Sequence, residues 1–179
     1  MIQFRPPSVT KPWDAFVAVD PVFVQPPVEP SDDASAEQVD EYKKAIAEYI
    51  AKLKAARETG DWTPMLVPGR SLAEATKFTL LPVDANIWRE LLDRATLPAD
   101  SLRRIGSVSM NAVLFRLAVK AISGLETRIE REHDPAWGYV MAQSEIVDIL
   151  DKEDPRIVGD LGNRIMERLR GVGPLSSKG

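Results

Sequence analysis

The sequence predicts a mainly α protein, a small helical bundle with one short strand or hairpin and an extended, proline-rich N-terminal arm. Half of the fourteen prolines lie within the first thirty residues, where they disfavour helix and favour extended backbone. Five later segments carry apolar residues at helical spacing. Strand character is concentrated in residues 78–81 (FTLL), which Pro82 ends.

The composition divides the chain into five parts. We expect an extended arm, an amphipathic helix, a linker loop, a helical domain and a polar tail, over residues 1–34, 35–59, 60–76, 77–171 and 172–179 respectively. In the linker, Pro64 and Pro68-Gly69 are turn signals. No repeat of fixed period is present.

The arm is too apolar for a disordered spacer. It carries Phe4, Trp13, Phe16 and Phe23, and residues 15–24 could form a short edge strand interrupted at Asp20-Pro21. Such rings must be buried on something. They either dock on a neighbouring subunit or lie back across the chain's own core, and the sequence leaves both alternatives open.

The helix over residues 35–59 has the clearest boundaries. Ser35 and Gln38 have the spacing of a capping box, and Gly60 ends the helix. Ile50 widens an apolar stripe with 3-4-3-4 spacing, whose members are Val39, Tyr42, Ile46, Tyr49 and Leu53. This stripe either packs on the chain's own domain or forms a seam with another subunit or partner helix.

Three longer helices and one short helix are expected in the C-terminal domain. Asp84 can cap a helix that buries Trp88, and a second helix runs from Ser107 or Ser109 to Ile122. The third starts at Asp154-Pro155, an acidic cap followed by proline at the first helical position. A short helix is expected after Ser144, and residues 126–134 (ETRIEREHD) are expected to be a solvated charged segment.

Composition and charge exclude several classes of function. The net charge is −4 and the pI about 5.2, which argues against nucleic acid as a partner. The absence of cysteine excludes disulfides and thiolate chemistry. The first residues lack a secretory signal, and no apolar run reaches the roughly 20 residues that span a bilayer. We therefore expect a soluble, intracellular protein.

Few residues suggest catalysis or ligand binding. The one histidine, His133, lies among charged neighbours, and no serine has a nucleophile-elbow context. The carboxylates at positions 148, 151, 153 and 154 lack the order of a calcium loop. Gly171-Val172-Gly173 follows a helix, and Pro174 blocks the helix that a dinucleotide loop requires. We expect no enzyme activity, cofactor, metal or small-molecule substrate.

The region from about residue 70 to the end resembles a known family. It runs F-T-L-L-P-V from Phe78, then a short helix, then an apolar helix ending A-I-S-G-L-E at residues 121–126, and finally a closing helix with I-V-x-x-L-G-x-x-I over residues 157–165. This order is similar to that of the tail assembly chaperones of tailed bacteriophages. The family often has tryptophan-glutamate-asparagine after the central glycine, where this chain has Leu125-Glu126-Thr127.

The resemblance implies a non-enzymatic role in phage assembly, as a tail assembly chaperone or a minor virion component. Its partners would be other phage structural proteins or copies of itself, in the host cytoplasm and, for a retained component, in the virion. The alternative is an adaptor or regulatory protein that binds a host protein through residues 35–57. The candidate partner-binding residues are Phe4, Trp13, Phe16, Phe23, Val39, Tyr42, Ile46, Tyr49, Leu53 and Trp62.

Overall fold

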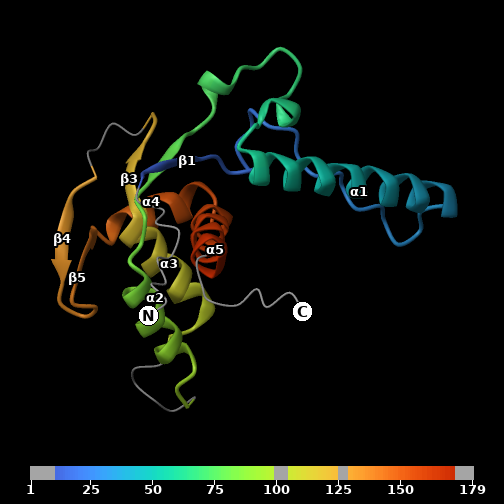
Figure 1. The fold of residues 1–179 in the computed structure, drawn as a ribbon. Helices are drawn as coiled ribbons and strands as arrows, with labels where there is room; N and C mark the ends of the chain where they lie inside the picture. Colours follow the sequence, from blue (N-terminus) through green and yellow to red (C-terminus); the bar gives the residue numbers. More distant parts are fainter. Residues whose placement is uncertain (1–10, 99–104, 125–128, 172–179) are drawn as a thin grey trace, which may run out of the picture. The chain divides into compact units, whose positions relative to one another are not determined.

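The computed structural model describes residues 11–98, 105–124 and 129–171. These residues divide into two compact units. The inserted unit is Phe16–Thr76, and the main unit consists of the chain before and after it. Phe4 and the polar tail lie outside the described residues. Figure 1 traces the course of the chain through its helices and strands.

The main unit contains a three-stranded antiparallel sheet. Its strands β1 (Trp13–Ala15), β2 (Phe78–Leu80) and β3 (Val119–Ile122) are ordered β1-β2-β3. The register pairs Ala15 with Phe78 and Phe78 with Ile122. The prediction of a strand at residues 78–81 is thus confirmed at Phe78–Leu80, whose two apolar ends are fully buried.

The helices of the main unit agree with the sequence at their starts. The Asp84 side chain accepts a hydrogen bond from the Asn86 amide, and Asp154 accepts one from the Arg156 amide. Trp88 is buried, as expected. Among these helices, α3 packs most extensively against α5, and Figure 1 shows them side by side. The four helices are α2 (Ala85–Ala95), α3 (Ser107–Ala118), α4 (Glu145–Glu153) and α5 (Arg156–Gly171).

The expected mainly α bundle is wrong. The described residues form five α-helices together with two small sheets, so the fold is mixed α and β. The second sheet is a hairpin of β4 (Arg131–Asp134) and β5 (Tyr139–Ala142). Strand β4 lies within residues 126–134, which were expected to form a solvated charged segment. This strand was not predicted, because a hairpin with exposed side chains leaves little apolar alternation to detect.

The helix expected to reach Ile122 ends four residues earlier, at Ala118, and continues directly as β3. Apolar residues continue into the strand as Val119, Ala121 and Ile122, so periodicity alone does not mark the change. The Arg131 side chain lies at this helix-to-strand junction, where its guanidinium donates to the carbonyls of Leu117 and Val119. The two acceptors lie on either side of the point where α3 ends and β3 begins.

The inserted unit consists of α1 (Ala36–Thr59) and the irregular segments on either side of it, which include two short 3-10 helices, η1 (Thr63–Met65) and η2 (Leu72–Glu74). The predicted capping box is confirmed. The backbone amide of Gln38 donates to the Ser35 hydroxyl, and the Gln38 side-chain oxygen accepts from the backbone amide of Ser35. Gly60 ends the helix with φ 78°, a left-handed conformation that glycine adopts without penalty.

The position of this unit in the chain is that of an insertion into a β-hairpin. Strands β1 and β2 are antiparallel neighbours, and every residue of the inserted unit lies between them in the sequence. Buried Asp20 joins the two ends of the unit, because its carboxylate accepts from the amides of Val22 at 2.9 Å and Thr76 at 2.8 Å. The unit thus leaves and rejoins the chain at neighbouring points.

Candidate protein interaction surface

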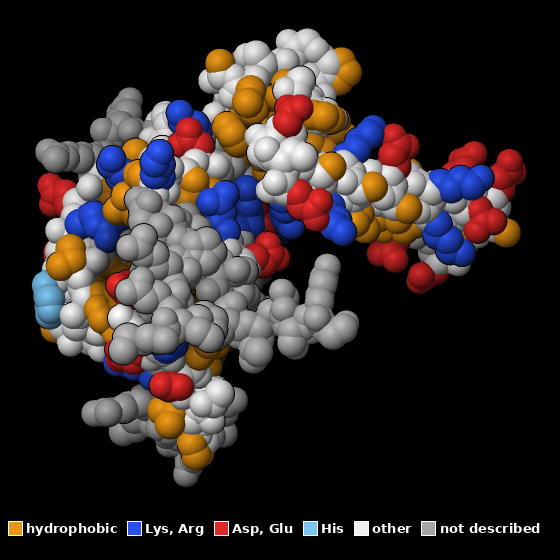
Figure 2. Space-filling view, viewed as in Figure 1, with side chains coloured by type: hydrophobic (Ala, Val, Ile, Leu, Met, Phe, Trp, Pro, Cys, Tyr) orange, Lys and Arg blue, Asp and Glu red, His pale blue; other side chains and the backbone are white. Residues whose placement is uncertain are grey.

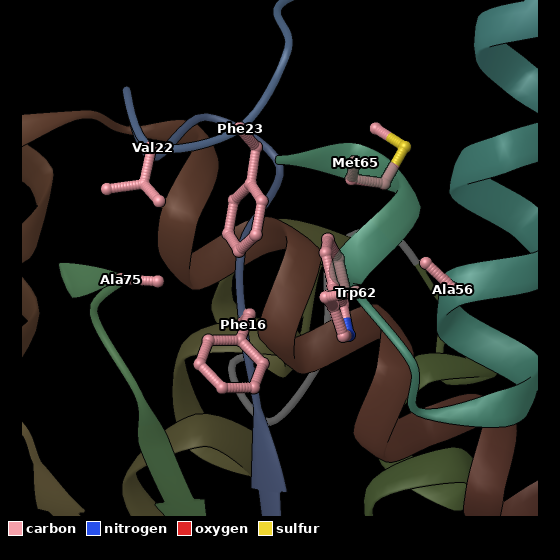
Figure 3. Close-up of a cluster of buried hydrophobic side chains, with 7 residues drawn as sticks. All are labelled: Phe16, Val22, Phe23, Ala56, Trp62, Met65 and Ala75. Atoms are coloured by element: carbon pink, nitrogen blue, oxygen red, sulfur yellow. The ribbon is translucent and has the colours of Figure 1, made fainter. Parts of the chain in front are cut away.

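Three of the aromatic residues predicted to bind a partner form the core of the inserted unit. Phe16, Phe23 and Trp62 are 8%, 0% and 1% exposed. The Phe23 and Trp62 ring centroids lie 5.1 Å apart, and Phe16 lies about equally far from both, at 6.1 and 6.0 Å. Figure 3 shows Trp62 between these two rings and Ala56 of α1. The chain itself covers these rings, which leaves them almost no surface for a neighbour.

Trp13 is half-buried in the main unit. The Arg168 guanidinium lies 3.7 Å from the centroid of its ring, and that of Arg164 lies at 5.8 Å. Such stacking is the geometry of a cation–π interaction, and burial lowers the pKa of Arg168. Trp13 therefore fastens β1 to α5.

The predicted stripe of α1 does lie on one face. Val39, Tyr42, Ile46, Tyr49 and Leu53 are all half-buried, and Ile50 at the edge of this α1 stripe is 56% exposed. Ala56 is the one fully buried residue among the 24 of the helix. Figure 2, viewed as Figure 1, shows hydrophobic side chains gathered along one side of α1 between charged ones.

The two halves of the stripe differ in what they contact. Tyr49 and Leu53, in the second half of the helix, pack against the core around Trp62. Val39, Tyr42 and Ile46, in the first half, are not among the residues that pack against this core. The apolar stripe therefore extends along α1 beyond the core.

The charged residues of α1 form exposed pairs along the helix. Lys52 lies 2.7 Å from Glu48, whose pKa is lowered by this hydrogen bond and by the lysine charge. Lys43 pairs with Asp40 at 3.4 Å, and Lys54 with Glu58 at 3.8 Å. These side chains are half or more exposed, and exposed pairs of this kind contribute little to stability.

Basic residues around Ile50 also belong to this surface, although they were not among the residues predicted from the sequence. Lys43, Lys54 and Arg57 all lie within about 60° of Ile50 around the helix axis, given 3.6 residues per turn. The same helical projection that revealed the apolar stripe would have shown them. We call these three residues the basic flank.

The candidates for catalysis lie apart from one another in structure and role. His133 is exposed on β4, opposite Val140. Of the acidic residues near position 150, Asp154 caps α5, while Asp148, Asp151 and Glu153 are exposed. Over the described part of the chain, no three His, Cys, Asp or Glu side chains are grouped closely enough to hold a metal ion.

None of the helices in the described ranges combines the length and the hydropathy that crossing a bilayer requires. Comparisons of this chain with models of protein families, with curated proteins and with solved structures found no match.

Proposed function

We propose that this protein is non-enzymatic and acts through protein–protein contacts made by the α1 stripe. The observation that carries the proposal is the partial cover of this stripe, since a 24-residue helix with regular apolar spacing has one fully buried residue. Helices of this kind obtain most of their stability from packing of the apolar face. A partner that covers the stripe from Val39 to Ile50 would bury side chains that the chain itself leaves half-buried or exposed.

The energy available from this surface suits a specific contact. Complete burial of an isoleucine side chain contributes about 1.5–3 kcal/mol, and Ile50 is more than half exposed. Ile46 and Tyr42 precede it on the same face and are half-buried. Partner contacts that bury all three would contribute several kcal/mol, from which the entropic cost of association must be subtracted.

The biological setting that we propose is the assembly of a tailed-phage particle, in the host cytoplasm or in the virion itself. Support for it comes from the motifs between Phe78 and Ile165 that resemble tail assembly chaperones. The partner would then be another phage structural protein. The surface proposed for this role is the α1 stripe, because the rings of Phe16 and Phe23 are buried within the chain.

Site-specific photo-crosslinking in phage-producing cells tests the proposal. A photoreactive residue is placed at Ile50 of the full chain, and at Lys44 on another side of α1 as a control. We expect position 50 to crosslink to a phage structural protein in assembling particles, and position 44 to crosslink far less. A host protein captured at position 50 would support the adaptor role instead, and a second copy would support self-association.

A double substitution gives the matching loss of function. Ile46→Asp with Ile50→Asp should abolish co-purification of the chain with its partner, because charged side chains replace apolar contacts. Circular dichroism should show that the helical content is retained. Unchanged co-purification, or equal crosslinking from positions 44 and 50, would overturn the proposed role of this surface.

A further inference from the structure

The charged residues of α1 that project within about 60° of Ile50 are all basic. Lys43 and Arg57 lie seven positions before and after it, and Lys54 lies four positions after it. These positions fall on the same side of an α-helix as Ile50. No acidic residue of α1 lies within about 60° of Ile50 on this projection. All three basic residues are exposed.

The acidic residues of α1 lie elsewhere on the helix. Glu37, Glu41 and Glu48 project about 140° or more away from Ile50, and Asp40 and Glu58 lie at the edge of the basic flank, about 80° away. Asp40 and Glu58 each form an exposed pair with a lysine of the flank. Because such pairs are weak, the lysines can exchange these partners for others at little cost.

We propose that the occupant of the α1 stripe is an amphipathic helix whose apolar residues are flanked by acidic ones. This inference rests on the proposed function and names the chemistry of the partner. A helical partner matches the stripe, because apolar residues at three- and four-residue spacing pack into the grooves of a facing helix. Glutamates or aspartates beside that apolar face would meet the basic flank, which favours the correct partner and register.

The same charges disfavour a second copy of this chain as the occupant. In an antiparallel pair centred on Ile50, Lys43 of one chain would face Arg57 of the other. In a parallel pair, each basic residue would face its own copy. Like charges opposed at an interface cost binding energy, so symmetric pairing through this face is disfavoured in either direction.

Two synthetic peptides of matched length test the inference on the full chain. Both carry leucine at the same i, i+3, i+4 and i+7 positions of a helix, but one has glutamate and the other lysine beside the leucines. By fluorescence anisotropy at low salt, the glutamate peptide should bind at least about tenfold more tightly than the lysine peptide. The difference should shrink at about 0.5 M salt, because the charges are then screened.

Variants of the chain locate the effect. Lys43→Glu with Lys54→Glu should reverse the preference between the peptides, whereas Lys44→Glu with Lys52→Glu, which changes the net charge equally on other sides of the helix, should leave it unchanged. Ile50→Asp should weaken binding of the glutamate peptide at least tenfold, and the milder Ile50→Ala should weaken it less. Circular dichroism checks that each variant is folded.

Equal affinity for the two peptides, binding of neither, or equal effects of the two double variants would overturn the acidic-helix inference. None of these results would overturn the proposed function, which depends on crosslinking from position 50. If position 50 captures a partner whose contacting segment is not acidic, the proposed function stands and this inference fails.

Discussion

At the scale of single residues, the β4–β5 hairpin depends on Asp134. Its carboxylate lies 2.9 Å from the Arg116 guanidinium, and both side chains are largely buried, with 15% and 11% of their surface exposed. It also accepts from the amides of Ala136 and Trp137 in the turn. Burial alone would raise the pKa of Asp134, but these hydrogen bonds and the Arg116 charge outweigh it, so the pKa lies below its ordinary value.

The substitution Asp134→Asn should therefore destabilise the protein in a pH-dependent way. At neutral pH we expect a loss of about 1–3 kcal/mol in the free energy of unfolding, because largely buried Arg116 loses its counterion. A lowered pKa means that the carboxylate contributes fully above about pH 4 and progressively less as the pH falls through its folded value. The difference between wild type and variant should shrink below about pH 4.

Urea unfolding at pH 7, 4 and 3 measures this difference. Glu132→Gln is the control, since Glu132 is exposed on the same strand, and it should change stability by less than about 0.5 kcal/mol. A gap between wild type and Asp134→Asn that stays constant from pH 7 to pH 3 would contradict the assigned role of the Arg116–Asp134 pair.

At the scale of elements, the contact between α3 and α5 depends on one glycine. A Cβ added at Gly162 would lie 2.5 Å from the Cβ of Asn111, 2.6 Å from its Cα and 2.7 Å from its carbonyl oxygen. The Asn111 side chain then spans the crossing, donating to the carbonyl of Gly159 and to the side chain of Asn163. The two helices approach so closely because position 162 has no side chain.

Alanine substitutions at the two glycines of α5 should have effects of opposite sign. Gly162→Ala forces the backbone of α3 away, and we expect it to lower the free energy of unfolding by about 1–3 kcal/mol. Gly159→Ala meets nothing within 4 Å, so the better helix propensity of alanine should raise stability by about 0.5–1 kcal/mol. Chemical unfolding of both variants measures these changes in the free energy of unfolding. Equal effects, or stabilisation by Gly162→Ala, would contradict the close approach of the helices.

At the scale of the whole molecule, local signals predicted the elements better than their assembly. The capping box at Ser35, the caps at Asp84 and Asp154 and the glycine at position 60 act within a few residues, so the sequence reveals them directly. The hairpin depends on Arg116 and Arg131 reaching other elements, which no local pattern encodes. The prediction of a mainly α fold was wrong because these contacts, and the hairpin that depends on them, could not be read from the sequence.

In the candidate site, too, the features that depend on local spacing were predictable, and those that depend on distant contacts were not. The spacing of the apolar residues placed the stripe of α1 on one face. The apolar character of the arm showed that its rings must be buried, but not where. Phe16 and Phe23 precede α1 in the sequence, whereas Trp62 follows it. The contact of these rings therefore joins segments that are distant in sequence. Only the structure could therefore show that the rings of Phe16 and Phe23 are buried in the chain's own core and not on a neighbouring subunit.

The insertion of residues 16–76 between two paired strands leads to a prediction about the main unit. Replacing residues 16–77 by Asn-Gly would join Ala15 to Phe78, which already pair across β1 and β2, through a two-residue turn that suits such hairpins. The main unit keeps its own buried residues, including Phe78, Phe115 and Leu161, so it should unfold cooperatively by circular dichroism. It should also lose the partner contact, because α1 is gone. A shortened chain that binds ANS and shows no cooperative transition would contradict the independence of the main unit, and one that still captured the partner would move the interaction surface away from α1.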